Sequence, residues 1–211
     1  SVSIHSLKTS GFISQNCIFQ SQTLLKQKSC AIWVDSSESI LNKNIFLNFI
    51  SDAGAAIKFS FLKEDNYLPS VFLENNVFHN NTGFVGGAVL IYGDAVIEIK
   101  GNFFHKNKAV KDDSGSLGIG GCLFVLNSSS VQASKLILLE NWFILNKAEY
   151  FAANFFSFLT LLVSKTVESQ KIDSADSNIY FENDDFSNFH KGVSYPPFFL
   201  AVNEFIFPAE Y

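Results

Sequence analysis

The sequence predicts an all-β fold, a right-handed parallel β-helix of about six or seven coils. Three observations indicate it: a motif Asn-x-Phe-x-x-Asn recurs, alternating apolar residues precede the motif, and a pair of small residues follows it. The spacing of Phe78 and Phe104 sets the unit at about 26 residues, and insertions lengthen it at only two places. Short strands joined by corners, without helical periodicity, make one coil per unit.

The apolar residues before the motif form the first expected strand. They stand five and three positions before the motif begins, and alternation with a period of two indicates a strand. The pairs are Val71 and Leu73, Ile97 and Ile99, Leu136 and Leu138, and Ile179 and Phe181.

The motif itself supplies the second strand and a corner. Because successive coils lie about 4.8 Å apart, its Phe residues are expected to stack as an aromatic column in the core. Its last Asn is expected to form a ladder of side-chain amides that satisfies backbone groups left unpaired by the turn. The rings expected to stack are Phe46, Phe78, Phe104 and Phe143. Clear motif copies begin at Asn76, Asn102 and Asn141, and weaker ones begin at Cys17, Asn44 and Asp184.

A block of small residues opens the third expected strand. Its paired glycines adopt backbone angles closed to other residues, at the point where the chain re-enters a strand. The copies are Gly86-Gly87-Ala88-Val89, Gly120-Gly121-Cys122-Leu123, Gly54-Ala55-Ala56-Ile57 and the degenerate Ser29-Cys30-Ala31-Ile32. The residues expected to share one column of small side chains are Ala56, Ala88, Cys122 and Cys30.

The chain is expected to form a single β-helix domain over residues 1–211, as part of a longer protein, because it contains no Met even at position 1. Residues 40–150 repeat most clearly, one further coil is expected around Phe186, and residues 190–211 are interpreted as a cap or edge. An irregular all-β domain that the first 40 residues do not join remains an alternative. Polar insertions at Lys63–Pro69, Lys111–Gly118 and Asn127–Ser134 are expected to be corner loops.

The composition argues against two classes of partner. The net charge is −5 and all 15 basic residues are scattered lysines, whereas nucleic-acid binding favours a clustered basic face. The longest apolar run, Phe151–Val163, is shorter than the roughly 20 residues that span a bilayer. We therefore expect no nucleic acid partner and no transmembrane segment in this chain.

The motifs resemble the paired GGA[IVL] and FxxN repeats of the chlamydial polymorphic outer-membrane proteins and of large surface proteins of ciliates and other protists. Gly86–Val89 with Phe78–Asn81, and Gly120–Leu123 with Phe104–Asn107, carry the resemblance; Phe143–Asn146 lacks a following Gly-Gly. The resemblance covers roughly residues 40–150 and implies a right-handed parallel β-helix. It further implies a non-enzymatic, structural or adhesive role outside the cell or at its surface, with protein or glycan partners there or within a larger assembly.

A carbohydrate-binding or polysaccharide-degrading β-helix is the alternative function. Pectate-lyase-type sites need a catalytic Arg, and this chain contains none. Polygalacturonase-type sites need several converging Asp with a His and a basic residue, but the available groups stand at different corners. Solvated turn aspartates are the favoured interpretation, so no catalytic residue is predicted. The groups considered are Asp112, Asp113, Asp184, Asp185, His190 and Lys191.

His79 and His105 each follow a motif Phe and are therefore expected to stack in one column. One strand separation could let two imidazoles bridge a metal ion, but the neighbouring column offers Asn and Lys in place of a third ligand. Two exposed stacked histidines are the favoured interpretation, and no metal or cofactor is predicted.

The cysteines and glycosylation sequons leave several questions open. Cys30 and Cys122, aligned in one column three coils apart, are too distant for a disulfide, while a Cys17–Cys30 pair remains an alternative. Buried small hydrophobic residues are the default interpretation of all three cysteines. The sequons begin at Asn80 and Asn127, and glycosylation of either stays undecided.

Overall fold

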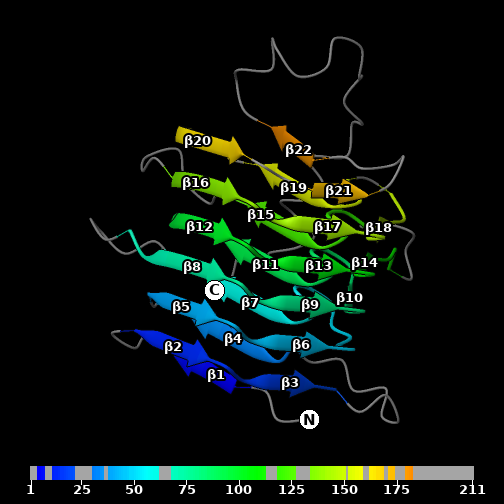
Figure 1. Cartoon of the computed structure of the whole chain (residues 1–211), viewed down its shortest axis with the longest axis horizontal. Helices are drawn as coiled ribbons and strands as arrows, with labels where there is room; N and C mark the ends of the chain where they lie inside the picture. The colour runs from blue at the N-terminus through cyan, green and yellow to red at the C-terminus, as the bar shows by residue number, and fades with distance from the viewer. Residues whose placement is uncertain are drawn as a thin grey trace.

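The structure is a computed structural model in which every described strand pairs in parallel with its neighbours. The strands form stacked sheets, and Figure 1 shows successive coils rising from β1–β3 to β20–β22. No helix occurs in the part of the chain that the structure describes. The predicted parallel β-helix is confirmed. The described residues are 4–7, 11–21, 30–35, 38–61, 68–112, 118–126, 134–150, 152–158, 162–168, 171–173 and 179–182.

Each coil contributes one strand to each of three large sheets. The first sheet contains, in order, β1 (Ile4–Leu7), β4 (Ile32–Asp35), β7 (Ile57–Ser60), β11 (Val89–Tyr92), β15 (Leu123–Leu126), β19 (Phe155–Phe158) and β22 (Ile179–Glu182). The second contains β2 (Phe12–Gln15), β5 (Ser39–Asn42), β8 (Ser70–Glu74), β12 (Val96–Lys100), β16 (Ser134–Leu139) and β20 (Leu162–Glu168). The third contains β3 (Ile18–Gln20), β6 (Ile45–Leu47), β9 (Val77–His79), β13 (Phe103–His105), β17 (Trp142–Ile144) and β21 (Lys171–Asp173). A small fourth sheet contains β10 (Thr82–Gly83), β14 (Lys108–Ala109) and β18 (Lys147–Ala148).

The described residues among the first 40 belong to the β-helix. β1 pairs with β4, β2 with β5 and β3 with β6, each in the register of the later coils. The alternative of an N-terminal segment outside the solenoid is therefore wrong. The number of complete coils remains a prediction, because residues 183–211, which include Phe186 and the expected cap, lie outside the described residues.

The motif phenylalanines stack as the sequence predicts. Neighbouring ring centroids in the column are 4.8 to 5.2 Å apart and the planes lie within 6° of parallel. The four central rings are fully buried, and together with the apolar residues of the other sheets they form the core. The column consists of Phe19, Phe46, Phe78, Phe104 and Phe143.

The column of small residues exists, but one predicted member is wrong. Because Ile32 pairs with Ile57, the residue in register with Ala56 is Ala31, and Cys30 stands one position earlier. Backbone hydrogen bonds run from the Ala31 N–H to the Ala56 carbonyl, and in the same way upward through Ala88 to Cys122. The predicted alignment of Ser29-Cys30-Ala31-Ile32 with Gly54-Ala55-Ala56-Ile57 agrees with this register, so the error lay only in assigning Cys30 and not Ala31 to the column.

One strand of the later coils also differs from the prediction. Ile179 and Phe181 belong to β22, which pairs with β19 in the first sheet, and not to the strand preceding a motif. Alternating apolar residues fit any of the three sheets, so this pattern alone could not assign the strand. The coil of Phe143 has no Gly-Gly pair, as the sequence indicates; because Phe155 is in register with Leu123, Ala152, Ala153 and Asn154 occupy the positions of that block. Ala152 adopts the positive φ (57°) that Gly120 adopts in the coil before (65°).

Candidate functional site

The outer side of the third sheet carries two columns of side chains that are almost entirely apolar or aromatic. Because strand residues alternate between faces, the residues on either side of each motif Phe point away from the core. One column contains Ile18, Ile45, Val77, Phe103 and Trp142; the other contains Gln20, Leu47, His79, His105 and Ile144. We call these ten residues the third-sheet face. These ten residues, from β3 to β17, include no Lys, Asp or Glu; in the last strand of the sheet, β21, Lys171 and Asp173 are in register with Trp142 and Ile144.

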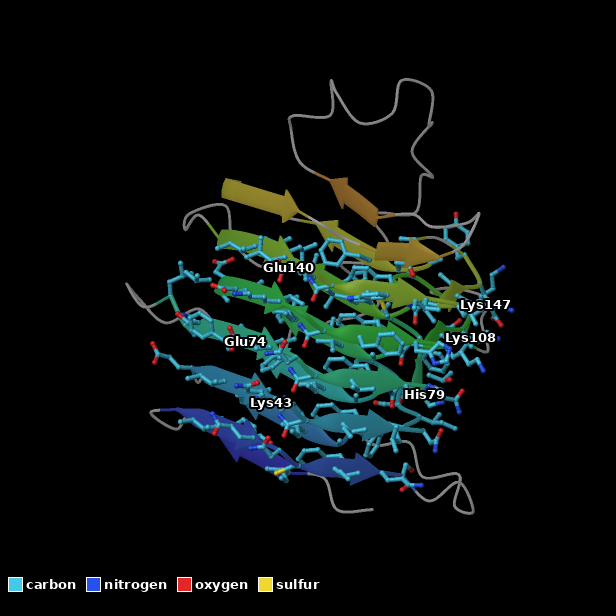
Figure 2. The ribbon with its side chains drawn as sticks, viewed as in Figure 1. Lys43, Glu74, His79, Lys108, Glu140 and Lys147 are labelled. Atoms are coloured by element: carbon cyan, nitrogen blue, oxygen red, sulfur yellow. The ribbon has the colours of Figure 1, made fainter. Side chains whose placement is uncertain are left out.

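The third-sheet face is accessible to solvent. Ile18 is 70% exposed and Trp142 is 40% exposed, while Val77, Phe103 and His79 are partly buried by their neighbours. Charged side chains flank it: Figure 2 shows Lys43, Glu74 and Glu140 at the corner before the sheet, and Lys108 and Lys147 beyond the corner after it. A contiguous apolar surface with a charged rim is typical of an interaction site.

Asparagine ladders hold both ends of the third-sheet strands. Each ladder Oδ1 accepts a hydrogen bond from a backbone N–H of the coil below, and where the residue below is itself a ladder Asn it also accepts one from that residue's Nδ2. The lowest members differ: Asn44 Oδ1 accepts from the Cys17 N–H and Ser14 Oγ. Asn81 Oδ1 accepts from the Phe49 N–H. Each ladder Nδ2 also donates to a backbone carbonyl of a lower coil. All seven side chains are buried. Before the strands the ladder is Asn44, Asn76, Asn102 and Asn141; after them it is Asn81, Asn107 and Asn146.

The ladder after the strands is the one that the sequence predicts, whereas the ladder before them was not predicted. The corner residue that precedes each ladder Asn has a positive φ, for example Asn75 (53°) and Asn80 (55°). This turn leaves the next backbone N–H pointing towards the neighbouring coil, where a ladder Oδ1 accepts it. Asn76 N–H, for instance, donates to Asn102 Oδ1 at 2.9 Å.

His79 and His105 meet on the third-sheet face as predicted. Their Nδ1 atoms are 3.0 Å apart and the ring centroids are 4.9 Å apart, with the planes tilted by 39°. The Phe103 ring lies 5.7 Å from the His105 ring. Burial lowers the pKa of His105, and the nearby His79 and Lys106 lower it further. His105 is therefore neutral at neutral pH.

Two aromatic rings lie beside the histidines. The centroids of Phe103 and Trp142 are 6.5 Å apart and their planes are inclined by 49°. Both occupy the first variable position of the Asn-x-Phe-x-x-Asn motif, where Ile45 and Val77 stand in earlier coils. This position is variable in the motif, so the motif did not predict the column, although an apolar residue there in five of the six copies was the available signal.

A salt bridge lies beyond the corner, next to the fourth sheet. Lys108 Nζ is 2.5 Å from Glu149 Oε1, and the Lys111 backbone N–H donates to Glu149 Oε2 at 2.9 Å. The hydrogen bond from the Lys108 side chain, followed by that from the Lys111 N–H, lowers the pKa of Glu149. The Lys111 ammonium also lies 5.8 Å from the centre of the Tyr150 ring.

Of the six residues considered for polysaccharide chemistry, only Asp112 lies within the described residues, so the structure does not show them together. Asp112 is partly buried near the end of the segment that follows β14. Asp113, Asp184, Asp185, His190 and Lys191 lie outside the described residues. Among the residues that the structure does describe, no three His, Cys, Asp or Glu side chains form a group that could hold a metal ion. The described part of the chain contains no helix, and therefore no helix that could cross a membrane.

The three cysteines are free thiols. Cys30 and Cys122 are buried as expected, but Cys17 is exposed, so the interpretation as a buried small residue is wrong for Cys17; the Cys17–Cys30 disulfide is not formed. Burial raises the pKa of both buried thiols. Asn80, the first residue of one sequon, is exposed and donates from Nδ2 to Asn48 Oδ1 at 2.8 Å. Asn127 lies outside the described residues.

No protein-family model, curated protein or solved structure matches the chain.

Proposed function

We propose that the chain is a non-enzymatic β-helix scaffold of a secreted or cell-surface protein, and that it binds a protein or glycan partner through the third-sheet face. The observation that supports this proposal is the contiguous apolar surface from β3 to β17, bounded by charged residues. Single exposed apolar residues are ordinary, but two adjacent columns of them are uncommon on a surface that has no partner.

The role of the repeated polar residues supports a scaffold. The ladder asparagines are buried, and their amide groups hydrogen-bond to neighbouring coils. They therefore stabilise the solenoid and do not face a substrate. The resemblance of the repeats to those of bacterial and protist surface proteins supports the extracellular location, and the net charge of −5 favours a partner other than nucleic acid.

Carbohydrate binding is the second candidate, and Trp142 favours it. An exposed indole next to a second aromatic ring on a flat sheet gives an apolar platform on which the CH face of a sugar ring can pack. In this version the partner is a glycan, and the same face binds it. Degradation of a polysaccharide would in addition need the aspartates near residues 112 and 184.

A binding screen with paired variants tests the proposal. The full chain is applied to arrays of glycans and of immobilised extracellular-matrix proteins, together with F103S/W142S. The control is I13S/I40S, which removes two exposed apolar residues from the outer side of the second sheet. We expect binding that F103S/W142S reduces at least about tenfold, since aromatic residues dominate interface energies, and that I13S/I40S retains.

Circular dichroism checks that both variants keep the β fold. Equal binding by F103S/W142S and the unmodified chain would contradict the proposal that the third-sheet face is the site. Binding to proteins without any binding to glycans would exclude the second candidate.

A further inference from the structure

We propose that His79 and His105 form a two-histidine binding site for a divalent late transition-metal ion such as Ni²⁺, Zn²⁺ or Cu²⁺, with water in the remaining coordination positions. This inference goes beyond the proposed scaffold function and does not depend on it. It uses two nitrogen ligands from adjacent coils, and imidazole is a ligand that suits these three ions.

The distance between the two nitrogens fits a shared metal ion. Bonds of about 2.0–2.1 Å from imidazole nitrogen to the metal, at an angle of about 90–110° between them, place the two nitrogens about 2.9–3.4 Å apart. The Nδ1 atoms of His79 and His105 are 3.0 Å apart. Two cis positions of one ion therefore match the existing spacing without movement of the strands.

The backbone holds both histidines in place before any metal binds. They are in register on β9 and β13, and the N–H of Asn80 donates to the His105 carbonyl at 3.0 Å. Two residues further on, the ladder joins Asn81 to Asn107 through bonds of 3.1 and 3.0 Å. Binding therefore orders little of the protein, which favours affinity.

The proton between the rings must move when the metal binds. In the neutral pair, one Nδ1–H donates to the lone pair of the other Nδ1, because two bare nitrogens at this distance would repel each other. The metal takes both Nδ1 lone pairs, so the donating ring exchanges its Nδ1 proton with solvent and carries one on Nε2 instead. The neutral pair thus binds the ion with no net release of protons.

Among the described residues, the neighbours of the two histidines neither supply a further metal ligand nor block the approach of the ion. Leu47 and Ile144 flank the histidines in their column, and the Phe103 ring lies beside His105. Lys106 is exposed, so solvent and salt screen its repulsion of a cation.

Calorimetric titration with Ni²⁺ at pH 7.5 tests the proposal. The full chain carries C17S, because the exposed thiol of Cys17 would otherwise bind the ion as well. We expect one Ni²⁺ per chain, and a loss of affinity of about tenfold or more in H79Q and in H105Q, because each variant removes one of two linked ligands. The matched control is H5Q/H190Q, which removes the other two histidines and should bind as before.

Three calorimetric results would overturn the site: no binding, unchanged binding in H79Q or H105Q, or loss of binding in H5Q/H190Q. A second measurement tests the site without substituting either histidine. Substoichiometric Ni²⁺, which is paramagnetic, should broaden the ring-proton NMR signals of both His79 and His105 in the C17S chain. Broadening of only one ring, or of neither, would contradict a shared ion.

Discussion

At the scale of single residues, the ladder asparagines satisfy backbone N–H and C=O groups at the corners, as capping and turn residues do in other folds. Asn102 Oδ1 accepts from the Asn76 backbone N–H and from Asn76 Nδ2, at 2.9 and 3.0 Å. Asn102 Nδ2 donates to the Leu73 carbonyl and to Asn141 Oδ1. A side chain of this length with both a donor and an acceptor is needed, because each amide joins three coils.

We predict that Asn102→Ala destabilises the fold by about 3 kcal/mol, because it leaves a buried N–H and a buried carbonyl unpaired. Denaturant unfolding measures the change in the free energy of unfolding. The control is Asn42→Ala, at a partly buried position where the side-chain oxygen has no hydrogen-bond partner within the described chain. A cost for Asn102→Ala no larger than that for Asn42→Ala would show that the ladder does not stabilise the coils.

The salt bridge of Glu149 predicts a dependence of stability on pH. Because the folded protein lowers the pKa of this carboxyl, its contribution is present above the ordinary carboxyl pKa and is lost as the pH falls through the lowered value. The chain should therefore be more stable than E149Q at pH 7, and the difference should disappear in acid. Thermal unfolding of both proteins across this pH range makes the comparison. A difference that grows as the pH falls would have the wrong sign.

At the scale of elements, the register of the coils follows from a few positions where only certain residues fit. Gly86 and Gly120 open β11 and β15 with a positive φ, at 57° and 65°. Gly87 is needed for another reason: a Cβ there would overlap the backbone carbonyls of Gly121 and Lys108. The pair thus combines a turn that favours glycine with a close approach of two coils.

We predict that Gly87→Ala costs about 1–3 kcal/mol of unfolding free energy, the range for overpacking in a rigid surrounding. Gly11→Ala is the matched control, because its Cβ would meet its nearest atom, the Glu38 carbonyl oxygen, at 3.9 Å. Chemical denaturation of the two variants separates the effects. If Gly87→Ala were as stable as Gly11→Ala, the close packing of these coils would be wrong.

The elements whose motif positions hold the same residue type in most repeats could be predicted from sequence, and the others could not. Phe78, Asn81 and Gly86 recur because each occupies a position with a strict physical demand, so alignment alone placed the column, one ladder and one turn. Ile179 lies where those residues are missing and was assigned to the wrong sheet, whereas Cys30 stands one position before Ala31, the residue that the block alignment itself places in the column. The contact of His79 with His105 followed from register, but the Nδ1 distance depends on ring orientation, which a sequence pattern does not contain.

At the scale of the whole molecule, the residues that stabilise the solenoid and those of the proposed binding surface occupy different positions of the same motif. The buried Phe column and the asparagine ladders stabilise the stack, while the variable positions of the same motif form the third-sheet face. Residues such as Phe103 and Trp142 can therefore differ between coils without disturbing the core. A rigid surface with repeating rows of side chains suits a scaffold that binds an extended partner.

The central claim is that equivalent residues of successive repeats stack in parallel register, and nuclear Overhauser effects between phenylalanine rings test it most directly. In a chain with labelled phenylalanine, the rings of Phe78 and Phe104, whose centroids lie 4.8 Å apart, should give strong ring-to-ring effects. Phe46 and Phe78 should do the same at 5.0 Å. Absence of both effects in the folded protein would contradict the stacked coils and, with them, the third-sheet face.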